Sequence, residues 1–153
     1  MIIFYKEIKM GFSSYMSGYE EERTLFQIES LYKWQKNEYF PPVIVEVSPV
    51  GSCNQKCVFC YIENINTKKD RLSESCIVNT FINMGKMGVK SVLLQGTGEP
   101  LLHKNIEHAV IEGYKHGLNF CLTTNGVLLT PKIQENILRY FTFLKFSVLD
   151  NNP

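Results

Sequence analysis

The sequence lacks the features that mark several large classes of protein. Its 153 residues contain no apolar run that approaches the ~18 residues needed for a membrane-spanning helix. The 16 basic and 15 acidic residues leave a formal charge of +1, so no charge excess indicates a nucleic acid or a membrane surface as a partner. There is no internal repeat and no low-complexity segment. These absences leave an ordinary globular domain as the expectation.

The amino-terminal residues also lack the pattern of a secretory signal. The opening stretch, MIIFYKEIKM, has too short an apolar core and no small-residue cleavage site. The five cysteines, an odd number of which three are clustered, fit a reducing compartment better than a disulfide scaffold. With 44% hydrophobic residues, the chain can bury the core of one domain. We therefore expect a cytoplasmic protein.

Short apolar runs alternate along the chain with stretches of helical periodicity. This alternation predicts β/α units that build a parallel sheet. Ser73 is a suitable cap for one helix, Gly88 is a suitable stop for it, and Thr130 followed by Pro131 is a suitable start for another. The four expected strands are 43–47, 91–95, 119–123 and 143–148. The expected helices run from Ser73 to about Met87, from about Ile106 to Gly117, and from Thr130 to about Leu138.

A further amphipathic helix is predicted before the sheet, over residues 20–39. We expect Trp34 to anchor this helix against the rest of the fold. The chain then divides into an N-terminal helical extension, 1–40, and a core domain, 41–153. The side chains expected to face inward from this helix are Leu25, Ile28, Leu31 and Tyr32.

Three cysteines within eight residues are the most informative feature of the chain. Cys53, Cys57 and Cys60 lie in the stretch CNQKCVFCY, after the first expected strand. Ligation by thiolates alone favours an iron–sulfur cluster or zinc. Three thiolates leave one iron of a four-iron cubane free to bind a substrate or a cofactor. A zinc site would instead need a fourth ligand, for which Cys76 or His103 is the candidate.

Polar and glycine-rich motifs follow the other expected strands. GTGEP, residues 96–100, follows the second strand, and TTNG, residues 123–126, follows the third. Residues 147–150 close the fourth. The carboxyl ends of parallel strands form one edge of a sheet, where α/β folds place their active sites. The motifs therefore predict one site at this edge, shared with the cysteines. His103, His108 and His116 are expected to face solvent instead.

The cysteine motif and the three motifs after it, taken in their order along the chain, resemble those of the radical S-adenosylmethionine (radical SAM) superfamily. The resemblance rests on Cys-x3-Cys-x2-Cys with Phe59 before the last cysteine, on the Gly-Glu-Pro and Thr-Asn-Gly turns, and on Ser147 and Asp150. It implies an α/β fold, a partial TIM-like (β/α) barrel with parallel strands and about four β/α units plus an N-terminal helix. Because the family's barrel normally has six units, it also implies the N-terminal portion of a longer enzyme, a truncated gene product or one piece of a split protein.

The resemblance further implies the cofactors. Cys53, Cys57 and Cys60 would ligate three irons of a 4Fe–4S cluster, and S-adenosylmethionine would chelate the fourth. The reduced cluster cleaves S-adenosylmethionine, and the resulting 5′-deoxyadenosyl radical abstracts hydrogen from a substrate. A reductant such as flavodoxin or ferredoxin is implied, whereas the substrate, a small molecule or a peptide, is not identified.

Five residues correspond to the family's cofactor contacts. Phe59 would pack against the adenine, Asn125 would shape the floor of the cofactor cavity, and Ser147 would contact the ribose or methionine part. Gly98 would let the backbone approach the ligand without a Cβ clash. Glu99 would accept a charge-assisted hydrogen bond from the methionine ammonium group. No side chain is assigned as a catalytic acid, base or nucleophile. The alternatives are a non-catalytic iron–sulfur electron-transfer module and a zinc-stabilised structural domain.

Overall fold

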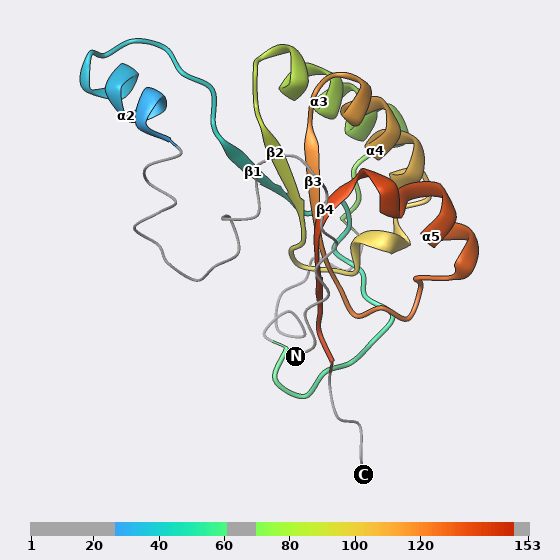
Figure 1. The fold of residues 1–153 in the computed structure, drawn as a ribbon. Coiled ribbons are helices and arrows are strands. Elements are labelled where there is room, and N and C mark those ends of the chain that lie inside the picture. The colour runs from blue at the N-terminus through green and yellow to red at the C-terminus, as the bar shows by residue number, and fades with distance from the viewer. Residues whose placement is uncertain (1–26, 61–69, 149–153) are drawn as a thin grey trace.

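The computed structural model describes residues 27–60 and 70–148, which form a parallel sheet with helices on one face (Figure 1). All three strand pairs are parallel, and the strand order β1-β2-β3-β4 follows the sequence. The predicted α/β fold is thus confirmed, and the described strands form an open sheet rather than a closed barrel. The strands are β1 (Ile44–Val47), β2 (Ser91–Leu94), β3 (Asn119–Thr124) and β4 (Phe141–Phe146).

The helices between the strands begin and end close to the predicted signals. The Ser73 side chain accepts a hydrogen bond from the backbone N–H of Cys76, and Thr130 accepts one from Ile133. Gly88, with φ of +86°, follows the end of the first helix. The helices are α3 (Glu74–Lys86), α4 (Ile106–Lys115) and α5 (Pro131–Ile137), with the short 3-10 turns η3 (Pro100–Leu102) and η4 (Leu138–Tyr140).

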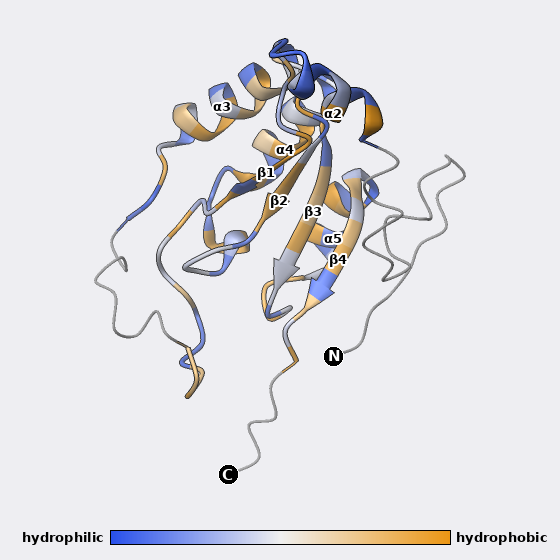
Figure 2. Cartoon of the chain, turned by 90° about the vertical axis from the view of Figure 1, so that its left-hand side faces the viewer, coloured by the Kyte–Doolittle hydropathy of each residue, from blue (hydrophilic) through white to orange (hydrophobic). Residues whose placement is uncertain are grey.

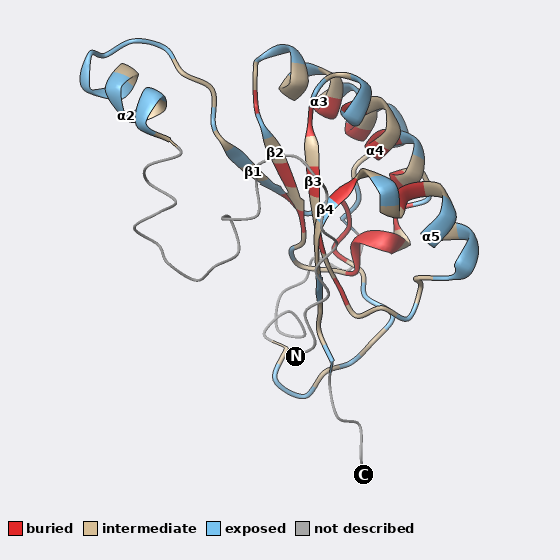
Figure 3. Cartoon of the chain, in the orientation of Figure 1, coloured by how far each residue is buried: buried red, intermediate tan, exposed pale blue. Residues whose placement is uncertain are grey.

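The core lies between the sheet and these three helices. In β3, Phe120 and Leu122 are fully buried, whereas the alternate residues Asn119, Cys121 and Thr123 point to the other face and are half-buried. Phe81 of α3 packs on Phe120, with ring centroids 5.3 Å apart. Figure 3 shows the buried residues gathered where the helices meet the sheet, and Figure 2 shows that the strands are largely hydrophobic. This packing holds the carboxyl ends of the strands in register.

The fourth strand begins two residues earlier than the sequence predicted. The expected strand was 143–148, whereas β4 spans Phe141–Phe146. Phe141 is buried, and its ring lies 6.1 Å from that of Phe120. The polar Thr142 interrupts the apolar run and hides the true start of the strand from a reading of the sequence. Burial of the Phe141 ring explains the earlier start.

The N-terminal helix is shorter and more exposed than predicted. Helix α2 spans Ile28–Gln35, and residues 20–26 lie outside the described part of the chain. None of its residues is buried, and Trp34 is 66% exposed. The expected inward packing of Ile28, Leu31 and Tyr32 and the anchoring role of Trp34 are therefore wrong. An amphipathic pattern shows that a helix has an apolar side but does not identify what covers that side.

The division of the chain into an N-terminal extension, 1–40, and a core domain, 41–153, stays a prediction. None of the helices among the described residues combines the length and apolar character needed to cross a membrane.

The start of the cysteine loop, residues 50–60, is held by hydrogen bonds to residues 70 and 71. Val50 forms an antiparallel bridge with Arg71. The N–H of Gly51 donates to the carbonyl of Asp70 at 2.8 Å. The segment that carries the cysteines therefore begins from a fixed position at the end of β1.

His103 holds the chain that follows the cysteine loop through a hydrogen bond to Leu72. It was predicted to face solvent, and that prediction is wrong, because the residue is buried. Its side chain is 2% exposed. Nδ1 accepts the backbone N–H of Asn105 at 3.3 Å, so Nε2 carries the proton and donates to the carbonyl of Leu72 at 2.9 Å. Burial of the ring is tolerated because both nitrogens are paired. His108 is exposed, as predicted, and His116 is half-buried.

Gly98 lets the chain after β2 pack directly against the cysteine loop. The N–H of Glu99 donates to the carbonyl of Ser52 at 3.0 Å. A methyl group at Gly98 would collide with the carbonyl oxygens of Ser52 and Val50. Gly98 is not among the glycines with positive φ, so the requirement for glycine is steric. At Gly98 the protein's own backbone approaches closely, and the ligand contact predicted for this residue stays a prediction.

Replacing Gly98 by alanine is expected to destabilise the domain by about 1–3 kcal/mol, the usual cost of overpacking. The added methyl group would push the cysteine loop away from the end of β2. Chemical denaturation should show the loss of stability, and hydrogen exchange should show faster exchange of the Gly51 and Glu99 amides.

Gly117→Ala is the matched control, because Gly117 has φ of +90° but nothing within 4 Å of an added Cβ. It should cost about 1–2 kcal/mol through backbone strain alone and leave exchange in the cysteine loop unchanged. Unchanged exchange at both Gly51 and Glu99 in Gly98→Ala would show that the two segments are not in contact.

Candidate functional site

Three segments meet at the carboxyl edge of the sheet: the cysteine loop, the β2 loop (residues 95–99) and the β3 corner (residues 124–126). They follow β1, β2 and β3, which are neighbours in the sheet. Backbone and side-chain hydrogen bonds connect each segment to another. The structure therefore brings together the cysteine, Gly-Glu-Pro and Thr-Asn-Gly motifs of the sequence.

Glu99 links the β2 loop to the β3 corner. Its side chain is 3% exposed, and Oε1 accepts hydrogen bonds from Thr124 Oγ1 at 2.7 Å and from the backbone N–H of Leu101 at 3.2 Å. Oε2 accepts the backbone N–H of Asn125 at 2.9 Å. A buried carboxylate is stable in a fold only when such donors satisfy it. Glu99 thus has a structural task in addition to the ligand contact predicted for it, which stays a prediction.

Asn125 links the β3 corner to the cysteine loop. Its Nδ2 lies 2.7 Å from Oδ1 of Asn54 and 3.7 Å from Sγ of Cys53. Its Oδ1 accepts the backbone N–H of Val127 at 3.0 Å. The place in the cavity floor predicted for Asn125 stays a prediction, and the sequence predicted no role for Asn54. Nothing in the sequence pairs these two side chains, because 71 positions separate them.

The three cysteines share one loop but are not gathered into a ready-made metal site. The N–H of Cys60 donates to the carbonyl of Cys57 at 2.9 Å, which places both residues in one turn. Burial raises the pKa of the Cys57 thiol, and the charges on Cys53 and Cys60 raise it further. In residues 27–60 and 70–148, no three His, Cys, Asp or Glu side chains are placed to hold one metal ion.

The chemistry of this donor set nevertheless fits a soft metal or an iron–sulfur cluster. Three thiols lie on one loop that is at least partly open to solvent. They are near enough for their charges to interact, so a bound cation would favour their thiolate forms. His103, one candidate for a fourth zinc ligand, already uses both ring nitrogens. Cys76, the other, is exposed on α3.

The other predicted cofactor contacts are Phe59 and Ser147. Phe59 is 73% exposed in the cysteine loop. Ser147 directly follows β4, and its N–H donates to the carbonyl of Thr124 at 2.9 Å, which places it beside the β3 corner. Asp150 lies outside the described residues. The structure thus places Ser147 beside the network of Glu99 and Asn125, and it leaves the Phe59 ring open to solvent.

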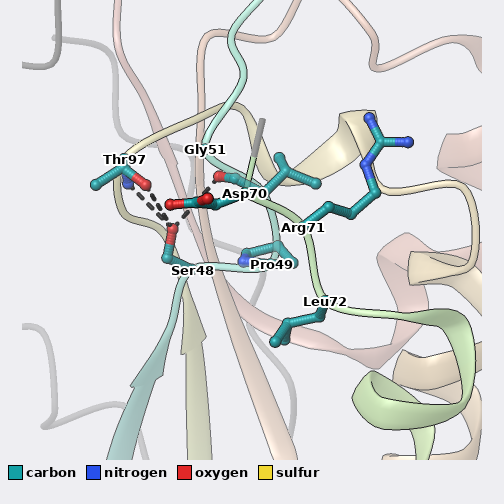
Figure 4. Close-up of a pocket in the computed structure, with 8 residues that line it drawn as sticks. Ser48, Pro49, Gly51, Asp70, Arg71, Leu72 and Thr97 are labelled. Carbon is teal, nitrogen blue, oxygen red and sulfur yellow. Dashed lines mark hydrogen bonds between the residues drawn. The ribbon is translucent and has the colours of Figure 1, made fainter. Parts of the chain in front are cut away.

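A pocket of about 380 Å³ opens at the base of the cysteine loop (Figure 4). It is lined by residues 48–51, residues 70–72 and Thr97. The Ser48 Oγ lies 3.1 Å from both the backbone nitrogen and the Oγ1 of Thr97, and this contact joins the ends of β1 and β2. Ser48 was not among the predicted site residues, although its place directly after a predicted strand was a signal. The pocket adjoins the candidate site but is not lined by the cysteines.

Comparison with known proteins places these features in a family. The model of the Radical SAM superfamily matches residues 47–152. A probable GTP 3′,8-cyclase from Methanothermobacter marburgensis is 33% identical over 94 residues, which cover 61% of this chain and 30% of that protein. The chain thus spans about a third of the length of the curated relatives that it matches.

Solved structures share the fold. Streptococcus suis SuiB bound to S-adenosylmethionine superposes with a TM-score of 0.58 at 22% identity, over 83% of this chain and 30% of SuiB. The same protein bound to the precursor peptide SuiA gives a TM-score of 0.56 at 22% identity, over 92% and 31% of the two chains. At this identity the likeness concerns the fold alone. Because the superfamily model matches well over half of the chain, this protein belongs to the radical SAM superfamily.

Proposed function

We propose that this chain is the N-terminal part of the catalytic domain of a radical SAM enzyme. The observation that carries the proposal is the meeting of the cysteine loop, the β2 loop and the β3 corner at one edge of the sheet, joined through Glu99 and Asn125. A 4Fe–4S cluster and S-adenosylmethionine are the proposed cofactors. The reduced cluster would supply the electron that cleaves S-adenosylmethionine, and a substrate would then lose a hydrogen atom.

Cys53, Cys57 and Cys60 are the proposed ligands of the cluster. They would bind as thiolates, and the positive charge of the irons would offset the mutual repulsion that contributes to the raised pKa of Cys57. Binding would also have to draw the three side chains together, because the described loop does not hold them in a metal site. The base of the loop is anchored at Val50 and Gly51, so this rearrangement would concern the cysteines that follow.

The proposed contacts with S-adenosylmethionine are Phe59, Gly98, Glu99, Asn125 and Ser147. An ionised carboxylate can accept about four hydrogen bonds, and that of Glu99 accepts three from the described residues. Oε2, with one such donor, is therefore the atom available to the methionine ammonium group. Phe59 is exposed enough to cover an adenine ring without first leaving a core position.

The proposed substrate is a small molecule or a peptide. Relatives include enzymes named for GTP and a protein solved with its precursor peptide, so the family resemblance does not select between these classes. The chain spans about a third of such relatives, and we propose that the remainder of a complete enzyme supplies most substrate contacts. A reductant such as flavodoxin or ferredoxin would provide the electron.

Anaerobic reconstitution with iron and sulfide tests the cluster. The wild-type chain should turn brown and hold iron and labile sulfide in equal amounts, and its electron paramagnetic resonance signal should change when S-adenosylmethionine is added. Cys57→Ala should abolish the cluster, because it removes the central thiolate of the loop. Cys76→Ala is the matched control, since Cys76 is an exposed thiol on α3, and it should retain the cluster.

Other results would support other functions. A cluster that is indifferent to S-adenosylmethionine would indicate an electron-transfer module. Stoichiometric zinc without sulfide would indicate a structural domain. Full iron content in Cys57→Ala would contradict the assignment of the ligands.

Substitution of Glu99 tests the contact with S-adenosylmethionine. Glu99→Gln removes the negative charge, and we expect it to weaken S-adenosylmethionine binding to the reconstituted chain by about 10- to 100-fold, the equivalent of one charge-assisted hydrogen bond. Glu99→Ala should weaken binding similarly and also cost on the order of 3 kcal/mol of stability, because it leaves buried donors unpaired. Calorimetric titration and thermal denaturation measure the two effects.

Glu112→Gln serves as the control for charge alone. Glu112 lies on α4 and pairs with Lys115, away from the carboxyl edge of the sheet. Its substitution should leave S-adenosylmethionine binding unchanged. If Glu99→Gln binds S-adenosylmethionine as tightly as wild type does, then Glu99 serves the fold and not the cofactor.

A further inference from the structure

The orientation of the Asn125 side chain is determined by its neighbours. Oδ1 accepts the backbone N–H of Val127 at 3.0 Å. If the amide were turned over, two donors would face each other at this position, so the nitrogen must point the other way. The backbone N–H of Asn125 donates to Oε2 of Glu99 at 2.9 Å. These two hydrogen bonds, one to the side-chain oxygen and one from the backbone N–H, leave the side-chain nitrogen directed at the cysteine loop.

The amide nitrogen has two hydrogens and two acceptors in the cysteine loop. One acceptor is Oδ1 of Asn54 at 2.7 Å, and the other is Sγ of Cys53 at 3.7 Å. A thiolate accepts a hydrogen bond more strongly than a neutral thiol, because its charge assists the bond. Among the three cysteines, Cys53 is the one that receives this side-chain donor in the described structure.

Glu99 holds the β3 corner on both sides of Asn125. Its Oε1 accepts the hydroxyl of Thr124, and the oxygen of that hydroxyl accepts the N–H of Gly126 at 3.1 Å. Glu99 and Thr124 are 3% and 2% exposed. Rotation of the corner would break bonds in this buried network, and breaking them without water nearby is costly. The position of the Asn125 amide thus depends on the Glu99 carboxylate.

We propose that Asn125 is a positioning residue that donates a hydrogen bond to the sulfur of Cys53, and that Glu99 maintains this bond. The inference rests on the proposed function, because it concerns the sulfur as a cluster ligand. Hydrogen bonds to the cysteine sulfurs help set the potential of an iron–sulfur cluster. A donor stabilises the more negative, reduced state. Loss of the Asn125 amide therefore lowers the midpoint potential.

The test is a redox titration of the reconstituted chain without S-adenosylmethionine. Asn125→Ala should bind as much cluster as wild type and show a more negative midpoint potential. Asn125→Asp retains the acceptor for Val127, replaces the donor by an oxygen and adds a negative charge, so it should lower the potential further than Asn125→Ala does. This second variant keeps the test informative if Asn125→Ala does not fold.

Asn119→Ala is the matched control. Asn119 lies at the opposite end of β3, where its amide donates to the carbonyl of Lys90 at 3.3 Å. The same substitution at the far end of β3 should leave the potential unchanged. Thermal denaturation of the apo chains shows whether stability losses in the variants are comparable.

A double-mutant cycle tests the role of Glu99. Glu99→Gln alone removes a negative charge, which raises the potential, and loosens the corner that holds Asn125, which lowers it. In the Asn125→Ala background only the charge effect should remain, so the shift caused by Glu99→Gln should be more positive there than in the wild-type chain. Additive shifts would show that Glu99 acts on the cluster by another route and would overturn that half of the proposal.

The results separate this inference from the proposed function. A wild-type cluster with unchanged potentials in both Asn125 variants overturns the hydrogen bond and leaves the cluster assignment intact. A wild-type chain that assembles no cluster overturns both. A negative shift in the Asn125 variants, with none in Asn119→Ala, supports the bond.

Discussion

The buried carboxylate of Glu99 is the interaction on which the candidate site depends. Its two oxygens accept hydrogen bonds from Thr124 and Asn125, while its own N–H donates to Ser52 in the cysteine loop. One residue therefore connects the ends of three neighbouring strands. Desolvation makes an unpaired carboxylate expensive, so the three segments are stable together and not separately. The same group that was expected to bind a ligand also builds the surface that would receive it.

The cysteines themselves are held less firmly than the segments around them. The base of their loop is anchored by backbone hydrogen bonds, yet the three thiols do not form a metal site among the described residues. Burial and then the like charges on Cys53 and Cys60 raise the pKa of Cys57, and a bound cation would oppose that effect. We expect cluster binding and the gathering of the three thiols to be one coupled event. The base of the loop and the Asn125 amide beside Cys53 are already in place for it.

Local signals predicted the regular elements well. Strands with buried alternate residues and helices with Ser73 or Thr130 as caps are determined by neighbouring residues, so they could be read from the chain. The failures involve contacts between distant segments. Trp34 was expected to anchor its helix against the rest of the fold and is exposed, whereas His103 was expected in solvent and is buried against Leu72. Neither outcome is encoded in the residues adjacent to it.

The sequence by itself determined the parallel sheet, the family and the edge at which the site lies. Strand periodicity and four motifs at strand ends suffice for that, because parallel strands present all their carboxyl ends on one side. Only the tertiary structure decided that Gly98 serves the approach of a backbone, that Glu99 joins two loops, and that Asn125 faces Cys53. These pairings are hydrogen bonds and steric contacts between residues up to 72 positions apart, and they exist only once the sheet has brought the strand ends together.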